Sequence, residues 1–575
     1  MEESKAQPKR RTVGVIGAGI SGLVTAKELK DVGVECEVFE MMPMLGGAFA
    51  HYGWKEGKLT SSSSFTWFSD FPMENRQEFL SWPRWLDYLQ RYVDHNGIQD
   101  AFHFNCKVLS VEKSSAGGWD FTVHRKNWSN GAWQHPSQVD VTEEVFTKHF
   151  DVVVAGTGLH NLPNMPDFPG VDSFKKAGGE VIHSSDFQDA SAFKSKRVLV
   201  VGAGESAADI TWLTSQHASH VGVSMRSPPG TMFPHWIKGY SADVRDNRLI
   251  YSLPRATWPL VLFAHRNFYY NVAKDKAEAE RADEFRLAAD MNYGAQNCIF
   301  TINACKSFGI VKAVTRNGAT MHTGIENIQG RTVYFTDGTK YEDCDSIIAA
   351  TGFRAKIPAI SDQNIANFFT DPRSLWKNMV CPEVDDFFAI GFCRPHQINL
   401  ITCCEMQARA AAQIIAGNKA LPPKEQMYDE IEAWKAHMGA TFSRGYRALV
   451  DFIPFIDGIA EYIGCAPNLA YYMVTDPLMW VHMTFAPIQP SQYRLSGPGA
   501  SYAQARATIM KSPYYKDVGN RLFRDAMVVL IALWAAIMGL LGFQKWNLVG
   551  KMRQPFQIAA CALVAASLYA LAVAA

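Results

Sequence analysis

Short apolar runs rich in valine and isoleucine recur along the chain up to residue 350, separated by longer segments of mixed polarity. The six clearest runs are residues 13–16, 34–39, 150–155, 198–201, 221–225 and 345–350. Continuous apolar runs of about four to eight residues are typical of strands buried on both faces of a parallel sheet. Helix-forming segments at 23–30 and 208–213 follow two of these runs. The pattern therefore predicts an α/β fold with parallel strands and crossover helices.

A glycine-rich turn joins strand to helix at two places. The first is Gly17-Ala18-Gly19-Ile20-Ser21-Gly22, and the second is Gly202-Ala203-Gly204-Glu205-Ser206-Ala207. Glycines at these positions let the backbone approach a diphosphate, and the helix N-terminus presents unpaired N–H groups to it. The sequence therefore predicts two Rossmann-like domains that bind two dinucleotides, one of which reduces the other. The candidate binding residues of the turns are Gly17, Gly19, Ser21, Gly22, Gly202, Gly204 and Ser206.

The charged residue after the second strand of each unit distinguishes the two sites. Glu40 follows Gly22 by 18 residues, and Arg226 follows Ala207 by 19 residues. A carboxylate at this offset accepts from a ribose hydroxyl and repels a 2′-phosphate, whereas arginine binds a 2′-phosphate. We therefore expect FAD at the first turn and NADPH at the second. The alternative, that both are ordinary solvated charges at strand ends, stays open.

The strands at 150–155 and 345–350 bracket the second glycine turn, which suggests that the NADPH domain is inserted into the FAD domain. We expect the FAD-binding domain over 1–165 and, after re-entry near Val333, over 331–450. The NADPH-binding domain then takes 166–330, and a covering region takes 451–525. Residues 228–297 interrupt the NADPH domain, either as a covering subdomain or as a membrane-facing lid that guides apolar substrates.

Two uncharged apolar runs lie near the C-terminus, at 526–543 and 556–575. Each approaches the roughly 20 residues that a helix needs to span a bilayer. The sequence therefore predicts that 526–575 forms a helical membrane anchor, of one or two transmembrane helices, in contact with lipid. The first eleven residues are polar and lack the apolar core of a signal peptide. We expect the catalytic domains to be cytosolic.

Composition excludes several other classes of function. Lysine plus arginine and aspartate plus glutamate both number 56 in the 575 residues, so no net basic charge favours nucleic acid. The 11 cysteines are scattered and have no metal-ligand spacing, so we expect reduced thiols and no metal. A pyridine-nucleotide disulfide reductase needs a closely spaced cysteine pair beside its flavin, and none follows the first glycine turn.

Further motifs give nearly the whole chain a resemblance to the flavin-containing monooxygenases, the class B flavoprotein monooxygenases, and in particular to their eukaryotic membrane-bound branch. After Glu40 comes Gly46-Gly47-Ala48-Phe49, with Phe49 where the family has tryptophan. The other matching segments are Asp70-Phe71-Pro72, the spaced set Ala177, Gly179, His183 and Phe187, then Ala350-Thr351-Gly352-Phe353, and Gln492 to Gly499. The resemblance adds Gly46, Gly47, Thr351 and Gly352 to the cofactor-binding residues.

The resemblance implies a reaction. NADPH reduces FAD, the reduced flavin captures O₂ as a C4a-hydroperoxide, and an amine or sulfide takes up its distal oxygen. It also implies attachment to the endoplasmic reticulum and a supporting, not catalytic, role for His183, and it leaves a homo-oligomer open. The alternatives are a Baeyer–Villiger-type oxygenase and an NADPH oxidase that produces hydrogen peroxide. Phe187 argues against the first, because Baeyer–Villiger relatives usually carry tryptophan there.

One departure from the family falls at the oxygenating site. The family's asparagine before Asp70 is replaced by a serine run, so that Ser61 or Ser62 is the candidate catalytic residue. Serine offers one donor and two acceptor sites, where asparagine offers two donors and a carbonyl. The serine either still holds the oxygenated flavin or lets peroxide escape. The alternative is that both serines are solvated loop residues.

Overall fold

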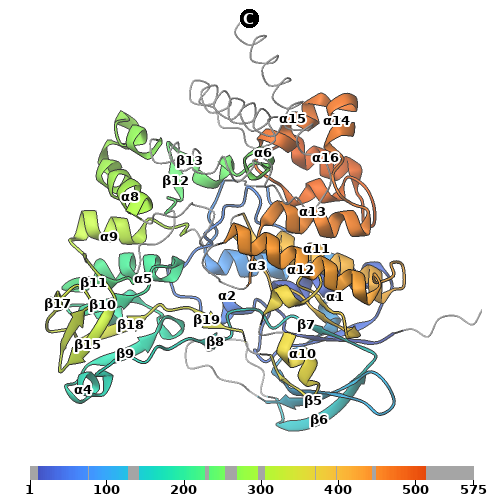
Figure 1. Ribbon diagram of the computed structural model, residues 1–575, viewed down its shortest axis with the longest axis horizontal. Coiled ribbons are helices and arrows are strands. Elements are labelled where there is room, and N and C mark those ends of the chain that lie inside the picture. Colours follow the sequence, from blue (N-terminus) through green and yellow to red (C-terminus); the bar gives the residue numbers. More distant parts are fainter. Residues whose placement is uncertain are drawn as a thin grey trace, which may run out of the picture.

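A computed structural model describes most of the chain up to Ser512. The described ranges are 11–74, 77–126, 141–226, 232–252, 268–294, 305–355, 357–368, 371–396, 398–442 and 448–512. Figure 1 shows two β-rich bodies side by side, with strands β10 and β18 in the left-hand body and β5 to β7 in the right-hand body. Helices α11 to α16 lie above the right-hand body.

The right-hand body is built on a six-stranded sheet in the order β21-β22-β7-β1-β2-β3. Its strands are β1 (Val13–Ile16), β2 (Cys36–Phe39), β3 (Phe102–His103), β7 (Val152–Ala155), β21 (Val380–Cys381) and β22 (Val384–Ala389). Strand β1 pairs in parallel with β2 and β7. Helices α1 (Ile20–Asp31), α2 (Ala48–His51), α3 (Trp82–Asn96) and α11 (Leu400–Ile415) accompany it. The predicted parallel strands at 13–16 and 34–39 are confirmed.

A second, mostly antiparallel sheet packs against the other face of this one. It consists of β4 (Cys106–Lys113), β5 (Trp119–Arg125), β6 (Glu144–Phe150) and the short β20 (Ala359–Ile360), followed by α10 (Gln363–Phe368). Its aromatic side chains approach so closely that a Cβ on Gly14 of β1 would lie 2.6 Å from the Phe150 ring. Phe121 and Phe150 fill this interface together with Trp119, all of them buried.

The left-hand body holds a five-stranded parallel sheet in the order β14-β11-β10-β18-β9. These strands are β9 (Glu180–His183), β10 (Arg197–Val201), β11 (His220–Ser224), β14 (Thr320–His322) and β18 (Ser346–Ala349). Helices α5 (Glu205–Ser215) and α9 (Gly309–Asn317) pack together. Around the sheet also lie α4 (Val171–Lys176) and the small antiparallel sheet β15 (Ile325–Gln329), β16 (Thr332–Phe335) and β17 (Lys340–Tyr341).

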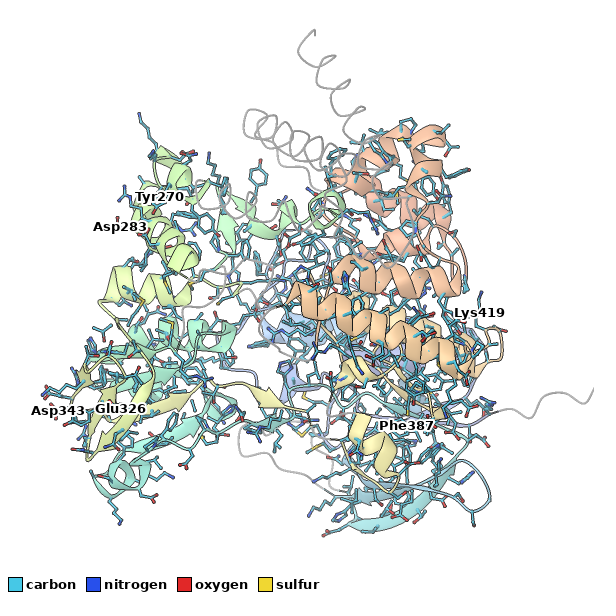
Figure 2. The ribbon with its side chains drawn as sticks, in the orientation of Figure 1. Tyr270, Asp283, Glu326, Asp343, Phe387 and Lys419 are labelled. Atoms are coloured by element: carbon cyan, nitrogen blue, oxygen red, sulfur yellow. The ribbon has the colours of Figure 1, made fainter. Side chains whose placement is uncertain are left out.

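The position of β18 corrects one prediction. The strand at 345–350 was expected to return to the first domain after re-entry near Val333, but β18 pairs in parallel with β10 and β9 of the second sheet. The chain crosses between the bodies on the antiparallel pair β8 (Leu162–Pro163) and β19 (Phe353–Arg354). Strand β22 then completes the first sheet beside β7, and Figure 2 shows its Phe387 in the right-hand body. The second sheet is therefore an insertion, but its return lies past 330.

The interrupting segment 228–297 is described in part. It contains β12 (Trp236–Ile237), β13 (Tyr240–Ser241), η4 (Ala242–Arg245), α6 (Arg248–Tyr251), η6 (Lys276–Arg281) and α8 (Ala282–Gly294). Phe285 of α8 lies 5.4 Å from Phe308 between ring centroids, so this segment covers α9. Tyr270 and Asp283 mark it in Figure 2. The apolar run at 260–263 lies outside the described residues.

The C-terminal covering region is helical. After α12 (Lys424–Thr441), which lies within the predicted range 331–450, it comprises α13 (Phe452–Ile463), α14 (Leu469–Thr475), α15 (Pro477–Phe485), η8 (Pro490–Arg494) and α16 (Tyr502–Met510). Among the helices that the structure describes, none is long and apolar enough to cross a membrane. The predicted anchor at 526–575 lies outside the described residues.

Candidate functional site

The first glycine turn admits no larger side chain at its critical positions. Gly17 has a φ of +98°, and its N–H donates to the Phe39 carbonyl at 2.8 Å. A Cβ on Gly22 would overlap the carbonyl oxygen of Gly17. Helix α1 begins at Ile20 without a side-chain cap. Its first N–H groups therefore remain available to an anionic ligand.

Glu40 lies against this turn, not in solvent. It is 5% exposed, and its two carboxylate oxygens accept from the backbone N–H groups of Ala18 at 2.7 Å and Met42 at 2.8 Å. Burial raises the pKa of this carboxyl, and the backbone donors oppose that effect. The alternative of a solvated charge is wrong for Glu40. With Met41 as a third backbone donor, the carboxylate still keeps an acceptor site for a hydroxyl.

The second glycine pair, Gly46-Gly47, packs directly on the first turn. The Gly46 N–H donates to the Ala18 carbonyl at 2.9 Å, and a Cβ on Gly47 would lie 3.0 Å from the Gly19 Cα. Sequence reasoning missed Gly391, which follows β22. A Cβ there would overlap the Ser21 hydroxyl. Because parallel strands end at the same sheet edge, a glycine just after a buried apolar strand was the available signal.

The second glycine turn has the same construction. Gly202 has a φ of +138°, and a Cβ on it would overlap the Ala350 carbonyl oxygen. Helix α5 begins at Glu205, next to the half-buried Ser206, and its N-cap Gly204 is exposed, with no heavy atom within 4 Å of a Cβ placed there. Arg226, just past β11, is exposed at the same sheet edge. Its role toward a 2′-phosphate stays a prediction.

Thr351 and Gly352 lie where the two linkers between the bodies pair. The Thr351 hydroxyl donates to the Asn164 carbonyl at 2.7 Å, and the Asn164 N–H donates to the Gly352 carbonyl at 2.9 Å. His183 Nε2 lies 3.0 Å from the same carbonyl, and its Nδ1 accepts from the Ser185 N–H. Burial lowers the pKa of His183, so the ring is neutral at neutral pH. His183 holds the linker.

The two candidate serines differ in their surroundings. Ser62 is fully buried, and both its N–H and its hydroxyl donate to the carboxylate of Asp243, at 2.6 and 2.7 Å. Burial raises the pKa of Asp243. Ser61 is half-buried, and the Thr66 hydroxyl donates to it at 2.9 Å. The alternative of a solvated loop residue is therefore wrong for Ser62, whose hydroxyl already donates its hydrogen bond to Asp243.

A cavity of about 20 Å³ lies beside this serine loop. Its lining residues are Thr60, Phe79, Phe233, Pro234, Ala242, Asp243, Asp246 and Lys306. This volume can hold about one water molecule, and the lining includes the carboxylates of Asp243 and Asp246 and the ammonium group of Lys306. The loop 60–64 and the interrupting segment thus meet at a small cavity whose mostly apolar lining carries a few charged groups.

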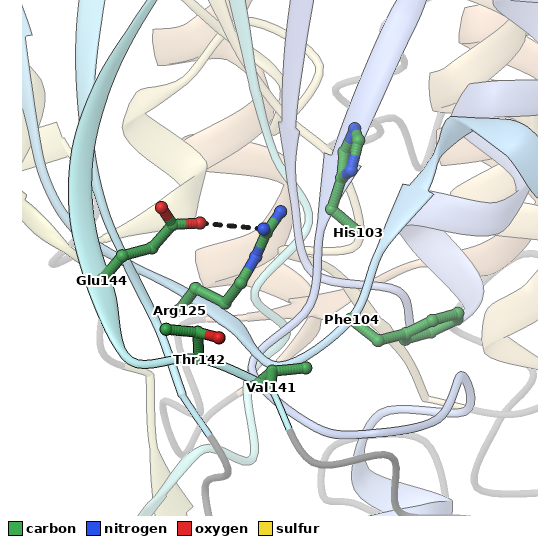
Figure 3. A pocket seen from close by; sticks show the side chains of 6 residues that line it. All are labelled: His103, Phe104, Arg125, Val141, Thr142 and Glu144. Carbon is green, nitrogen blue, oxygen red and sulfur yellow. Dashed lines mark hydrogen bonds and ion pairs between the residues drawn. The ribbon is translucent and has the colours of Figure 1, made fainter.

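A larger open hollow, of about 560 Å³, lies where β5 ends at Arg125 and β6 begins at Glu144. Figure 3 shows its lining, in which Arg125 Nη1 donates to Glu144 at 2.8 Å. Val141 and Thr142 border it next to residues 127–140, which lie outside the described residues. We assign no ligand to this hollow.

The comparisons with known proteins decide the family. The family model "Flavin-binding monooxygenase-like" matches residues 10–541. The chain belongs to this family. A 4-hydroxybenzoate brominase (decarboxylating) of Pseudoalteromonas luteoviolacea is 29% identical over 88% of this chain and 93% of its own length. Flavin-containing monooxygenase 3 of Canis lupus familiaris is 28% identical over 85% and 89%.

Two solved structures share the fold of this family member. S-allyl-L-cysteine S-oxygenase from Allium sativum matches 87% of this chain and 99% of its own, with a TM-score of 0.56 and 21% identity. Cyclohexanone monooxygenase with bound ε-caprolactone matches 78% and 97%, with a TM-score of 0.58 and 17% identity. The protein is thus an FAD-dependent monooxygenase that uses FAD and NADPH. Both glycine turns have the tight backbone packing that such groups require, since a Cβ on Gly22 or Gly202 would overlap a backbone carbonyl oxygen of the protein.

The family's Asp70 and Arg494 meet in a buried ion network behind α1. Arg494 Nη2 lies 2.6 Å from Glu28 and 2.8 Å from Glu405, and Lys27 pairs with Asp70. Burial raises the pKa of the Asp70 carboxyl, but Arg494 and Lys27 hold it below its usual range. Sequence matching found these motifs without showing their contact. The network ties the C-terminal covering region to the helix that follows the first glycine turn.

Proposed function

We propose that this monooxygenase transfers one oxygen atom of O₂ to a soft nucleophile, the nitrogen of an amine or the sulfur of a sulfide. In this proposal Gly17, Gly19, Ser21, Gly22, Glu40, Gly46 and Gly47 hold FAD. Gly202, Gly204, Ser206 and Arg226 hold NADPH, and Thr351 and Gly352 line the passage between the two. Bound FAD and NADPH supply the oxygen activation and the hydride. The chain's own residues orient them and exclude water.

The observation that carries the choice of substrate is the surroundings of Phe187. This side chain is 1% exposed, stacks on Phe193 at 5.8 Å between ring centroids, and meets Trp54 edge-on at 6.2 Å. Phenylalanine at this position resembles the nitrogen- and sulfur-oxygenating flavoenzymes, because Baeyer–Villiger relatives usually carry tryptophan there. An amine or sulfide uses its own lone pair as the nucleophile. The reaction therefore needs no general base from the protein.

Product analysis tests the proposal. The purified holoenzyme is supplied with NADPH, O₂ and, in parallel, a tertiary amine, a thioether, a cyclic ketone, or 4-hydroxybenzoate with bromide. We expect an N-oxide or a sulfoxide, with less hydrogen peroxide formed than product. A lactone from the ketone or a brominated phenol would identify a different oxygenation. Peroxide equal to the NADPH consumed with every compound would identify an oxidase.

The serine loop gives a second test, which separates its two candidates. Replacing Ser61 by alanine is expected to raise the peroxide formed per NADPH about fivefold, the equivalent of one neutral hydrogen bond of about 1 kcal/mol. Ser61→Asn restores the family's residue type and is expected to lower it again. Ser62→Ala is expected instead to lower the free energy of unfolding by about 1.5–3 kcal/mol, because it removes a donor from a buried carboxylate. Equal peroxide from the Ser61→Ala and wild-type enzymes would contradict the assignment.

We also propose that 526–575 anchors the enzyme to the endoplasmic reticulum, with the catalytic domains in the cytosol. The uncharged runs at 526–543 and 556–575 support this. We expect the full chain to remain with microsomes after carbonate extraction and a chain ending at Ser512 to be released. Retention of the shortened chain would place the anchor elsewhere.

A further inference from the structure

Arg394 lies in the right-hand body, here called the first body, and its side chain reaches the start of α5 in the left-hand, or second, body. Helix α5 is the helix that follows the second glycine turn. It lies on β23 (Arg394–Pro395), between β22 and α11, and its N–H donates to the Ala448 carbonyl at 2.6 Å, beside β24 (Leu449–Val450). Its Nη2 lies 3.5 Å from Oε2 of Glu205, the first residue of α5. A cation from one body therefore faces the helix N-terminus of the other.

That helix N-terminus has both favourable and unfavourable features for a diphosphate. Gly204 leaves open space in front of the turn and provides no side-chain cap. Two carboxyl groups lie close behind it, however, at the first and fifth residues of α5. Glu205 is half-buried, and Asp209 accepts from the Ser307 hydroxyl at 2.7 Å. Because like charges repel, a diphosphate at this end requires a nearby cation.

The guanidinium of Arg394 has uncommitted N–H groups that can donate to such an anion. A separation of 3.5 Å is at the outer limit of a hydrogen bond, and the side chain is 27% exposed. Within the described part of the chain, Glu205 is its only side-chain hydrogen-bond partner, so most of its five N–H groups are uncommitted. The neighbouring His160 does not compete as a cation, because burial and Arg394 lower its pKa to about 4.

We propose that Arg394 binds the diphosphate of the nicotinamide dinucleotide. Its guanidinium then exchanges the contact with Glu205 for a contact with the diphosphate. The inference rests on the proposed NADPH site at the second glycine turn. Arg394 then contacts a group common to NADPH and NADH, whereas Arg226 contacts the 2′-phosphate of NADPH alone. Because Arg394 belongs to the first body, dinucleotide binding joins the two bodies across their junction.

Binding of oxidised dinucleotides and their fragments tests this without turnover. Dissociation constants of NADP⁺, NAD⁺, ADP-ribose and adenosine 2′-monophosphate are measured by fluorescence quenching of the FAD-loaded enzyme. We expect Arg394→Gln to weaken NADP⁺, NAD⁺ and ADP-ribose by about tenfold each, as for one charged hydrogen bond, and to leave adenosine 2′-monophosphate unchanged. Arg226→Ala is expected to weaken only NADP⁺ and adenosine 2′-monophosphate.

Two further variants secure the interpretation. Glu205→Gln removes the competing anion and is expected to tighten NADP⁺ and NAD⁺ severalfold. Arg91→Gln removes an exposed arginine of α3 and controls for net charge. Unchanged binding in Arg394→Gln, equal weakening of all four ligands, or weakening by Glu205→Gln would overturn the role of Arg394. If instead Arg226→Ala weakens NADP⁺ and NAD⁺ equally, the proposed NADPH site fails while the NAD⁺ result for Arg394 still stands.

Discussion

Replacing Gly22 by alanine is expected to weaken FAD binding by about fivefold to 150-fold, since overpacking costs about 1–3 kcal/mol. The new methyl group would overlap the Gly17 carbonyl oxygen and push α1 away from β1. The N–H groups at the start of α1 would then leave the position in which they face a diphosphate. The flavin content of the purified protein and titration of the apoprotein with FAD measure the effect.

Gly439→Ala is the matched control. Gly439 lies within α12, and a Cβ there meets no heavy atom within 4 Å. Alanine is the better helix former by about 1 kcal/mol, so this variant is expected to bind FAD normally and to unfold at a slightly higher temperature. Unchanged FAD affinity in Gly22→Ala would show that the first turn does not approach the cofactor.

Local sequence patterns correctly predicted the strand, the turn and the helix at each of the two glycine turns. The runs at 13–16 and 198–201 became β1 and β10, and each glycine turn opens the expected helix. These predictions succeed because a buried strand, a tight turn and a helix start are set by residues close in sequence. The offset rule also placed Glu40 at the first turn, where its carboxylate meets the Ala18 N–H.

Pairings between distant residues could not be predicted in this way. A buried apolar strand has the same sequence pattern in either sheet, so the strand at 346–349 was assigned to the wrong one. Ser62 and Asp243 lie 181 residues apart, and nothing near the serine run indicates its buried partner. The buried ion network could not be predicted for the same reason, since Arg494 and Glu28 lie 466 residues apart.

Replacing Arg494 by methionine is expected to lower the free energy of unfolding by about 3–5 kcal/mol, because it removes the cation that several buried carboxylates share. Arg494 is 2% exposed and bonds to both Glu28 and Glu405. Urea unfolding followed by tryptophan fluorescence measures the loss. Arg506→Met is the control, since Arg506 pairs with Asp476 at 2.8 Å with a side chain 40% exposed. That surface pair is expected to contribute at most about 1 kcal/mol.

The pH dependence of this loss distinguishes lost charge pairing from lost packing. In the wild type, burial raises the pKa of Glu28, but Arg494 and Lys27 hold it below its usual range. These charge pairs therefore stabilise the folded protein at pH values above the unfolded-state pKa of Glu28. This stabilisation disappears as pH falls through the folded-state pKa. Without Arg494, the effect of burial on the pKa of Glu28 is opposed less strongly, and protonation of Glu28 then removes its buried charge at low pH. The difference in stability between wild type and Arg494→Met should therefore be largest near neutral pH and narrow as the solution is acidified. A difference that stays constant with pH would assign the loss to packing of the side chain alone.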